Sequence, residues 1–228
     1  DKAESRGLGD VYKRQQWYTV AKRSRTYVAK VLSGISGEYY KNYNVNRLIR
    51  RSNGIDLYYG DKSEFFSYDK VVLASHADQA LSIIDEPTKE EQEILSKFKY
   101  RENIAVIHTD ESIMPNNKDI WSSWNSSVDK NNVENNSITY WLNLLQNLDF
   151  NKNIFLTLNP NFKINEDKIL KKVNFTHPYF DQSALDNQDK LKNLQNKKNL
   201  LFCGSYFGYG FHEDGIKSSI EMIKAIDD

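Results

Sequence analysis

One apolar run, Lys70–Ser75, limits the folds open to this chain more than any other feature. Its centre, from Val71 to Ala74, is continuously apolar instead of alternating with polar residues. That pattern is typical of a strand buried on both faces, as in the parallel sheets of α/β proteins. A helical period follows directly over His76–Ile84. We therefore expect an α/β core built on a parallel sheet.

A second strand, turn and helix lie at the end of the sequence. Asn199–Cys203 is apolar, Gly204–Gly210 is a glycine-spaced turn rich in aromatic residues, and Gly215–Ile226 has a helical period. Glycines let a ligand approach the backbone, and the N–H groups of a first helical turn favour an anionic group. The turn is therefore a candidate cofactor loop, with a plain connection between core elements as the alternative. The residues expected on the buried helix face are Ile216, Ile220, Ile223 and either Ala225 or Ile226.

The rest of the chain divides into a helical part and a mainly antiparallel part. Ser24 is expected to cap a helix that carries Tyr27, Val28, Val31 and Leu32, and Thr88 to start a helix that reaches Phe98. Asn125–Asn136 is polar and is expected to be a surface loop. A weakly amphipathic helix is predicted over Asp181–Asn196. The remaining predicted strands are Trp17–Val20, Val45–Arg50, Ile55–Tyr59, Glu64–Tyr68, Ile104–Thr109, Ile120–Trp124, Ser137–Trp141 and Ile154–Leu158.

Composition excludes several classes of protein. Among 228 residues, 31 Lys and Arg balance 31 Asp and Glu, so no basic surface for a nucleic-acid backbone is expected. Cys203 is the single cysteine, which excludes an intramolecular disulfide and suggests a cytoplasmic protein. No apolar stretch is long enough to span a bilayer. The four histidines lack metal-ligand spacing, so no metal site is predicted.

The first residues resemble translated DNA adaptor. Asp10–Gln15 can be encoded by a sequence that resembles a transposon end used in preparing sequencing libraries. We therefore exclude residues 1–15 from the fold and expect the natural protein to continue upstream of Gln16. The sequence also has no G-x-x-x-x-G-K-S/T loop and no G-x-G-x-x-G turn that opens a helix.

Several ordered motifs carry a resemblance to one bacterial family. The chain resembles the predicted NAD/FAD-binding proteins of the flavin-containing amine oxidase and phytoene-desaturase superfamily, from about Trp17 to the C-terminus. Ordered motifs at family-like spacing are far more specific than one motif alone. The segments concerned are Lys70–Leu81, Ile107–Asp110, Met114–Pro115, Trp121–Asn125, Thr139–Trp141, Thr157–Pro160 and Phe202–Gly215.

The resemblance implies a two-domain FAD protein whose first βαβ unit is missing from this sequence. Residues 16–100 would be a partial Rossmann-like FAD-binding domain with parallel strands and a helical extension. Residues 101–180 would form the substrate domain, a mainly antiparallel sheet carrying helices, and residues 181–228 would return to the FAD-binding domain. The fold class is thus α/β with a mixed α+β character. The cofactor-binding residues implied are Val45, Ala74, Gly204, Ser205, Asp214, Gly215 and Ile216.

Two departures from the family pattern affect these implied contacts. The family normally has two glycines where Lys22 and Arg23 stand, and long cations there could block a flavin or substrate contact. Many relatives have Asp at the position of Ser205. The loop at Lys22 is therefore not expected to be functional, and the ribityl contact of Ser205 is less well supported than the others.

Candidate catalytic and pocket residues come from the aromatic loop and the second sheet. His212, beside two acidic residues, and Tyr209 are weak catalytic candidates, with a loop-stabilising hydrogen bond as the alternative for His212. Trp141, Tyr206 and Phe207 are candidate substrate-pocket residues, because loops often deliver functional side chains. For Trp141 a place in the core of the sheet is the competing prediction.

These features predict an amine-oxidase-like, FAD-dependent oxidoreductase that transfers a hydride from an apolar or amphipathic small molecule to flavin. A fatty-acyl lipid is suggested by resemblance alone, and peripheral contact with a membrane stays open. Partners are the substrate and the missing N-terminal part of the chain, but no nucleic acid. One alternative is a flavin-free accessory module or an inactive truncated product. Another is an isomerase that uses flavin without net redox change.

Overall fold

The computed structural model describes residues 18, 20–61, 64–129 and 132–227. The chain divides into two compact units, residues 1–41 and 42–228. The predicted adaptor segment 1–15 lies outside the described residues, as do two residues of the expected strand Trp17–Val20, while Tyr18 and Val20 are in no strand. None of the helices in the described part of the chain combines the length and the apolar composition needed to cross a lipid bilayer.

The first unit contains helix α2 (Ser24–Ser33), where a helix is predicted. Its expected start is wrong by one residue, because Arg23 occupies the N-cap and makes no side-chain hydrogen bond there. Lys22 and Arg23 both have positive φ angles, of 61° and 65°. Positive φ is uncommon for residues other than glycine, so the backbone here has the conformation that glycine adopts most readily. No residue of α2 is buried.

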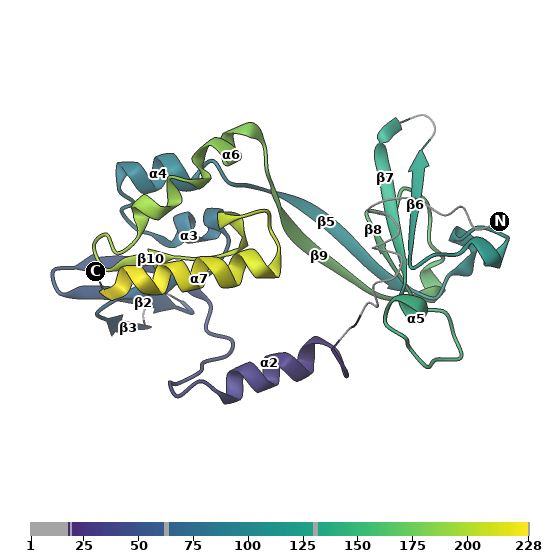
Figure 1. The fold of residues 1–228 in the computed structure, drawn as a ribbon, viewed down its shortest axis with the longest axis horizontal. Helices are drawn as coiled ribbons and strands as arrows, with labels where there is room; N and C mark the ends of the chain where they lie inside the picture. Colours follow the sequence, from purple (N-terminus) through teal and green to yellow (C-terminus); the bar gives the residue numbers. More distant parts are fainter. Residues whose placement is uncertain (1–17, 19, 62–63, 130–131, 228) are drawn as a thin grey trace, which may run out of the picture. The chain divides into compact units, whose positions relative to one another are not determined.

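The second unit contains three sheets (Figure 1). A meander of β1 (Val45–Arg51), β2 (Gly54–Tyr59) and β3 (Glu64–Tyr68) is antiparallel. A parallel pair joins β4 (Val71–Leu73) to β10 (Leu200–Phe202), which confirms the predicted parallel strands. The third sheet is antiparallel, with the order β6–β7–β8–β5–β9. Its strands are β5 (Lys99–His108), β6 (Trp124–Asp129), β7 (Asn132–Trp141), β8 (Phe155–Leu158) and β9 (Ile169–Tyr179).

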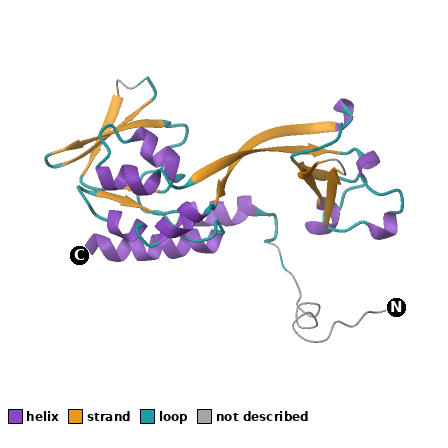
Figure 2. Ribbon diagram, turned by 90° about the horizontal axis from the view of Figure 1, so that it is seen from above, coloured by secondary structure: helices purple, strands orange, loops and turns teal. Residues whose placement is uncertain are grey.

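Helices and short 3-10 turns connect these strands, and the mixed α and β class is confirmed (Figure 2). The helix start predicted at Thr88 is confirmed and forms a capping box, in which the Glu91 N–H donates to Thr88 Oγ1 over 3.2 Å and the Thr88 N–H to Glu91 Oε2 over 2.7 Å. The α-helices are α3 (Ala77–Ile83), α4 (Lys89–Leu95), α5 (Leu142–Leu145), α6 (Gln182–Gln188) and α7 (His212–Asp227). The 3-10 helices are η1 (Glu111–Ile113), η2 (Lys118–Ile120), η3 (Glu166–Lys168), η4 (Leu191–Leu194) and η5 (Ser205–Phe207).

The main core lies around the parallel pair. Side chains from the meander, both parallel strands, α3, α4 and η4 make one buried cluster, which includes Leu48, Ile55, Leu73, Ala80, Leu95, Leu191 and Phe202. The expectation that Lys70–Ser75 is buried on both faces is wrong, because Val72 is 40% exposed. The reason is that β4 pairs with β10 alone among the described residues, and the face that carries Val72 is open.

The buried face of α7 differs from the predicted one. Ile216, Ile220 and Ile223 are 57%, 51% and 55% exposed, whereas Ser218 and Met222 are buried. Met222 packs with Leu201 and Cys203, the residues that end the last strand. Ser218 Oγ accepts the Gly204 N–H over 2.9 Å. This packing sets the rotation of the helix, so the isoleucine stripe is turned away from the core.

Three expectations for the second sheet are also corrected. The expectation that Asn125–Asn136 is a surface loop is wrong, because residues of this segment lie in β6 and β7, and pairing between these two strands satisfies the backbone of the polar residues. Ile120 ends η2, and the strand begins only at Trp124. β9 was not predicted, yet it pairs with β5 over nearly its whole length (Figure 2). Its position at the sheet edge tolerates Pro178, which has no N–H to donate.

Candidate functional site

The carboxyl ends of the two parallel strands form the first candidate site. Phe202 pairs with Leu73, and the Cys203 N–H donates to Leu73 O over 3.1 Å. The segments that follow, at Ser75 and Gly204, therefore leave the sheet together. In open α/β sheets, ligands bind in the crevice beyond the carboxyl ends of the strands. The structure thus brings two predicted cofactor positions, Ala74 and Gly204, to the edge where a ligand is expected.

Gly204 occupies a position that only glycine fits well. Its φ is +152°, and a Cβ atom there would lie 2.8 Å from the Tyr206 ring and 3.5 Å from Ser75 O. A side chain would therefore collide with the loop. Ser205 directly follows as the first residue of η5.

Tyr206 belongs to the main core instead of an open pocket. It is 2% exposed, and its ring packs edge-on against Phe98 at 5.4 Å between centroids. Its hydroxyl is buried without a hydrogen-bond partner among the described residues, and burial raises the pKa of this phenol well above its usual value. Phe207 lies against Tyr206, with 4.9 Å between their ring centroids.

Asp214 holds the aromatic loop in place. Its Oδ2 accepts the N–H groups of Tyr209 and Phe211, each over 3.0 Å. A Cβ atom on Gly208 would lie 2.4 Å from this carboxyl group, so glycine is required beside it. The Asp214 carboxylate is therefore directed at its own loop. Gly215 and Ile216 follow in the first turn of α7, with Ile216 exposed.

A cavity of about 660 Å³ brings together two more of the predicted cofactor residues. Val45 and Ala74 both line it, together with Asn46 and Ser75. The pairing of β1 with β2 shifts between Val45 and Arg47, so Asn46 is the extra residue of a bulge. Its Nδ2 donates to Gly60 O over 2.8 Å, and its Oδ1 is buried with no partner among the described residues.

Asn46 is the residue of this site that sequence reasoning missed. A buried acceptor without a donor is costly, and bulges often redirect a side chain at a functional site. No sequence pattern marks it, because the bulge arises only when the two strands pair. The arrangement suits a ligand that presents an N–H or O–H group to Asn46 Oδ1.

The catalytic candidates are not organised by the described structure. Tyr209 is 71% exposed, and His212 is exposed at the start of α7. Neither side chain is fixed by a hydrogen bond to another residue in the described segments. Both remain predictions without supporting geometry.

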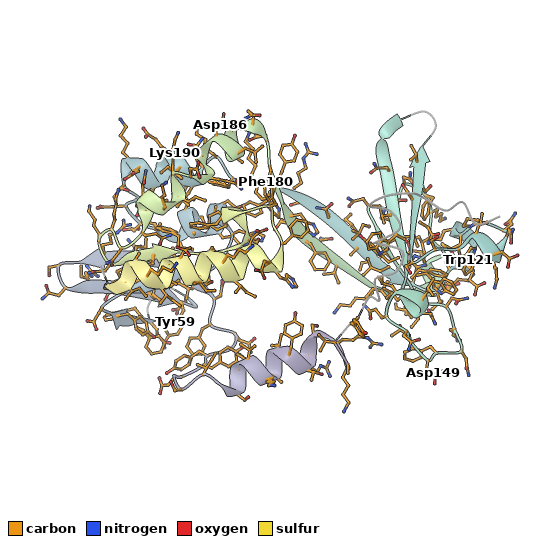
Figure 3. All side chains as sticks on the ribbon, viewed as in Figure 1. Tyr59, Trp121, Asp149, Phe180, Asp186 and Lys190 are labelled. Carbon is orange, nitrogen blue, oxygen red and sulfur yellow. The ribbon has the colours of Figure 1, made fainter. Side chains whose placement is uncertain are left out.

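Trp141 lies apart from the other two predicted pocket residues. It packs edge-on against Trp121 at 5.4 Å between centroids, and its Nε1 donates to Asn153 Oδ1 over 2.9 Å (Figure 3). This cluster, with Phe155 and Met114, covers one face of the antiparallel sheet. Tyr206 and Phe207 belong to the main core. The three residues therefore do not form one pocket within the described structure.

The opposite face of the antiparallel sheet is apolar and open. Trp124 and Val128 on β6 are 63% and 52% exposed, and Ile138 on β7 is 40% exposed. Because side chains alternate along a strand, these residues point away from the face that Trp141 covers. An open apolar face of this size suits contact with an apolar molecule or another protein segment.

Comparisons with known proteins place this fold. No protein-family profile matches the sequence, and no curated protein matches it. A solved structure of a CLA-producing fatty acid isomerase from P. acnes aligns with a TM-score of 0.61 at 14% identity, over 88% of this chain and 51% of the isomerase. Putrescine oxidase bound to putrescine aligns with a TM-score of 0.58 at 9% identity, over 90% and 52%. Cyclohexylamine oxidase from Brevibacterium oxydans aligns with a TM-score of 0.51 at 10% identity, over 82% and 49%.

At these identities the likeness establishes the fold alone. The chain spans about half the length of each of these solved structures.

Proposed function

We propose that this chain, which has the fold of about half of a flavin-containing amine oxidase, is part of an FAD-dependent oxidoreductase. One observation carries the proposal: the cavity at the carboxyl edge of β4 is lined by Val45, Ala74 and Asn46, whose Oδ1 is buried with no partner among the described residues. Bound flavin supplies a hydride acceptor for oxidation of a C–H or C–N bond.

The residues at this edge fit part of a dinucleotide. Asn46 Oδ1 suits the amino group of an adenine or a ribose hydroxyl, and Gly204 leaves backbone open to a close approach. The start of α7 favours an anionic group through its N–H groups, although Glu213 and Asp214 in the first turn oppose this. Asp214 is less of an obstacle, since two loop N–H groups already bind its carboxylate. We assign Val45, Asn46, Ala74, Gly204 and Ser205 to cofactor binding.

The substrate is proposed to be apolar or amphipathic. The open face with Trp124, Val128 and Ile138 offers apolar contact area but no charged group among these three residues. One structural neighbour is a fatty acid isomerase and two others are named for amines. An alkyl chain is the feature that an open apolar face of this kind can recognise, so a lipid-like substrate is the more specific form of the proposal.

A further strand-containing segment of the same protein is proposed to complete the parallel sheet. β4 has one strand neighbour among the described residues, and Val72 beside it is 40% exposed. Ile216, Ile220 and Ile223 form an exposed stripe on α7. Parallel sheets are normally buried on both faces and include more than two strands. Such a segment would cover both features and could supply a pyrophosphate-binding turn.

The first test is the reading frame upstream of Gln16 in uncut source DNA, followed by purification of the whole protein. We expect a strand, a G-x-G-x-x-G turn and a helix, and a flavin absorption spectrum that bleaches when an alkyl amine or lipid substrate is added anaerobically. A whole protein without flavin would refute the oxidoreductase and favour an accessory module. Turnover without an electron acceptor would favour an isomerase.

The second test uses the chain as it stands. FAD titration should show weak binding, because the sequence lacks a pyrophosphate cradle. Ala74→Asp places a carboxylate in the cavity and should remove that binding, whereas Ala29→Asp, on an exposed position of α2, should leave it unchanged. Tight stoichiometric binding by the unaltered chain, or equal binding by both variants, would contradict this assignment.

A further inference from the structure

A row of polar side chains crosses the covered face of the antiparallel sheet. Asn125 on β6 pairs with Thr139 on β7, and Thr139 pairs with Thr157 on β8. On β5 the direct partner of Thr157 is Val106, and His108, the partner of Phe155, reaches Thr157 diagonally. Thr139 is 4% exposed, and both Thr157 and His108 are fully buried. Polar groups buried this deeply must satisfy one another or bind something else.

The hydrogen bonds along this row have a definite direction. The Asp110 N–H donates to His108 Nδ1 over 3.2 Å, so the ring proton of the neutral imidazole lies on Nε2. Burial lowers the pKa of His108, which keeps the ring neutral. His108 Nε2 therefore donates to Thr157 Oγ1, 2.8 Å away.

The direction continues to the last hydroxyl. Thr157 Oγ1 accepts one hydrogen bond, from His108, and lies 2.8 Å from Thr139 Oγ1. If Thr157 donates to Thr139, every proton from His108 to Thr157 has an acceptor. If Thr139 instead donated to Thr157, the buried Thr157 hydroxyl would have neither His108 nor Thr139 as an acceptor, and an unsatisfied buried donor is costly. The Thr139 hydroxyl is thus left as a donor.

Thr139 borders a cavity that can receive this donor. The cavity has a volume of about 510 Å³, and its other lining residues are Ile113, Met114, Pro115, Asn125, Ser126, Ser127, Val128 and Phe162. Asn125 offers little to a ligand, because its Nδ2 donates to Ser122 O and its Oδ1 accepts the Ser122 N–H. Thr139 is therefore the most buried polar residue in the cavity wall. Its hydroxyl is also the one whose orientation is set by hydrogen bonds from His108 through Thr157.

The character of the wall defines the ligand. All nine lining residues are uncharged, so the wall offers no opposite charge to a carboxylate or an ammonium group. Met114, Pro115 and Phe162 supply apolar contact. A neutral molecule with a hydrogen-bond acceptor and a short apolar part satisfies both conditions.

We infer that this cavity is a binding site for an uncharged, amphipathic molecule whose carbonyl oxygen accepts a hydrogen bond from Thr139. His108 and Thr157 act as positioning residues that keep the Thr139 hydroxyl oriented as a donor. Ile113 and Met114 of the cavity wall pack in the cluster of Trp121 and Trp141, and Val128 of the wall also belongs to the open apolar face.

The test uses methyl hexanoate as the probe, with amide NMR spectra of the isotope-labelled full chain as the readout. The ester should perturb the signals of Ser127, Thr139 and their neighbours. Thr139→Val should weaken its binding about five- to tenfold, the effect of losing one hydrogen bond to a neutral group. Thr139→Ser keeps the hydroxyl and should bind like the unaltered chain. Thr176→Val, on an exposed position of β9, is the matched control.

Three outcomes would overturn the inference. They are no perturbation by the ester, equal binding by Thr139→Val and the unaltered chain, and hexanoate binding as tightly as its ester. If Thr139→Val does not fold, the footprint of the ester on the unaltered chain decides. Shifts confined to the cavity wall support the site, and shifts elsewhere contradict it.

Discussion

Replacing Asp110 by asparagine should strongly destabilise the antiparallel sheet. The Asp110 side chain is 2% exposed, and it joins the end of β5 to the segment before β9. Its Oδ1 accepts the Ser112 N–H over 3.1 Å, Ser112 Oγ over 2.8 Å and Lys168 Nζ over 3.1 Å. Its Oδ2 accepts the Asn165 N–H over 2.9 Å. An asparagine can keep one of these two acceptor oxygens.

The magnitude follows from the contacts that are lost. The substitution removes the charge from all four hydrogen bonds and places an NH₂ group against either the Asn165 N–H or the Ser112 and Lys168 donors. One unsatisfied buried donor costs about 1–3 kcal/mol, and hydrogen bonds to charged groups are each worth about 1.5–3 kcal/mol. The Lys168 side chain is 44% exposed, so its share is discounted. We expect a loss of about 2–3 kcal/mol, or roughly 5–10 °C in melting temperature.

The pH dependence gives a sharper test of the same contacts. Burial acts to raise the pKa of Asp110, but the hydrogen bonds from Asn165, Ser112 and Lys168 outweigh it and hold the pKa well below its usual value. A lowered pKa stabilises the folded state above the unfolded pKa of about 3.9, and this stability is lost as the pH falls below it. Between about pH 6 and pH 3 the unaltered chain should lose about 1 kcal/mol through this group, and Asp110→Asn should not.

Urea unfolding of the full chain at both pH values measures the two effects. Asp149→Asn, at an exposed loop position, is the control for a change in net charge (Figure 3). The reasoning is refuted if Asp110→Asn costs less than about 1 kcal/mol at neutral pH, or if its stability gap to the unaltered chain is the same at both pH values.

Three further predictions concern other parts of the chain. Arg23 has a backbone conformation (φ 65°, ψ −164°) that costs about 1–3 kcal/mol for a residue with a side chain. Arg23→Gly should remove this cost and increase the hydrogen-exchange protection of α2. Arg25→Gly, within the helix, should decrease that protection. Thr88→Ala should cost about 1 kcal/mol in urea unfolding by removing the capping box of α4, and Thr88→Ser should restore most of it. Burial lowers the pKa of His108, so below about pH 6.5 the unfolded chain binds a proton at this residue that the folded chain does not. The stability of the folded chain should therefore decrease as the pH is lowered through this range. His108→Gln should flatten this dependence in thermal melts.

The local signals in the sequence were sufficient for most elements near the main core. The apolar runs at Val71–Leu73 and Leu200–Phe202 are strands as predicted and run parallel, although their pairing with each other was not predicted, and a helix begins after Thr88 as expected. The Thr88 capping box involves residues three apart in sequence, so its hydrogen bonds follow from the local pattern, whereas the pairing of the two apolar runs joins segments far apart in the chain. The fold is similar to those of solved structures of a fatty acid isomerase, a putrescine oxidase and a cyclohexylamine oxidase. The domain boundaries and site residues stay predictions.

Features that depend on distant partners were decided by tertiary structure. The polar residues of β6 and the start of β7 are strand because these two strands pair with each other, and the long β9 pairs with β5. The rotation of α7 depends on Ser218 and Met222 meeting Gly204 and Leu201, so the more apolar isoleucine stripe is exposed.

The candidate sites divide in the same way. Glycine spacing and aromatic content predicted the loop at Gly204 as a candidate cofactor loop, because glycines without side chains let a ligand approach the backbone. Asn46 and the series His108, Thr157 and Thr139 carry no such mark. The unpartnered acceptor of Asn46 arises from the bulge in β1. The orientation of the Thr139 hydroxyl arises from pairing among β5, β8 and β7. Sequence alone determined the class of fold and the loop, whereas the polar groups available to a ligand were decided by contacts between distant strands.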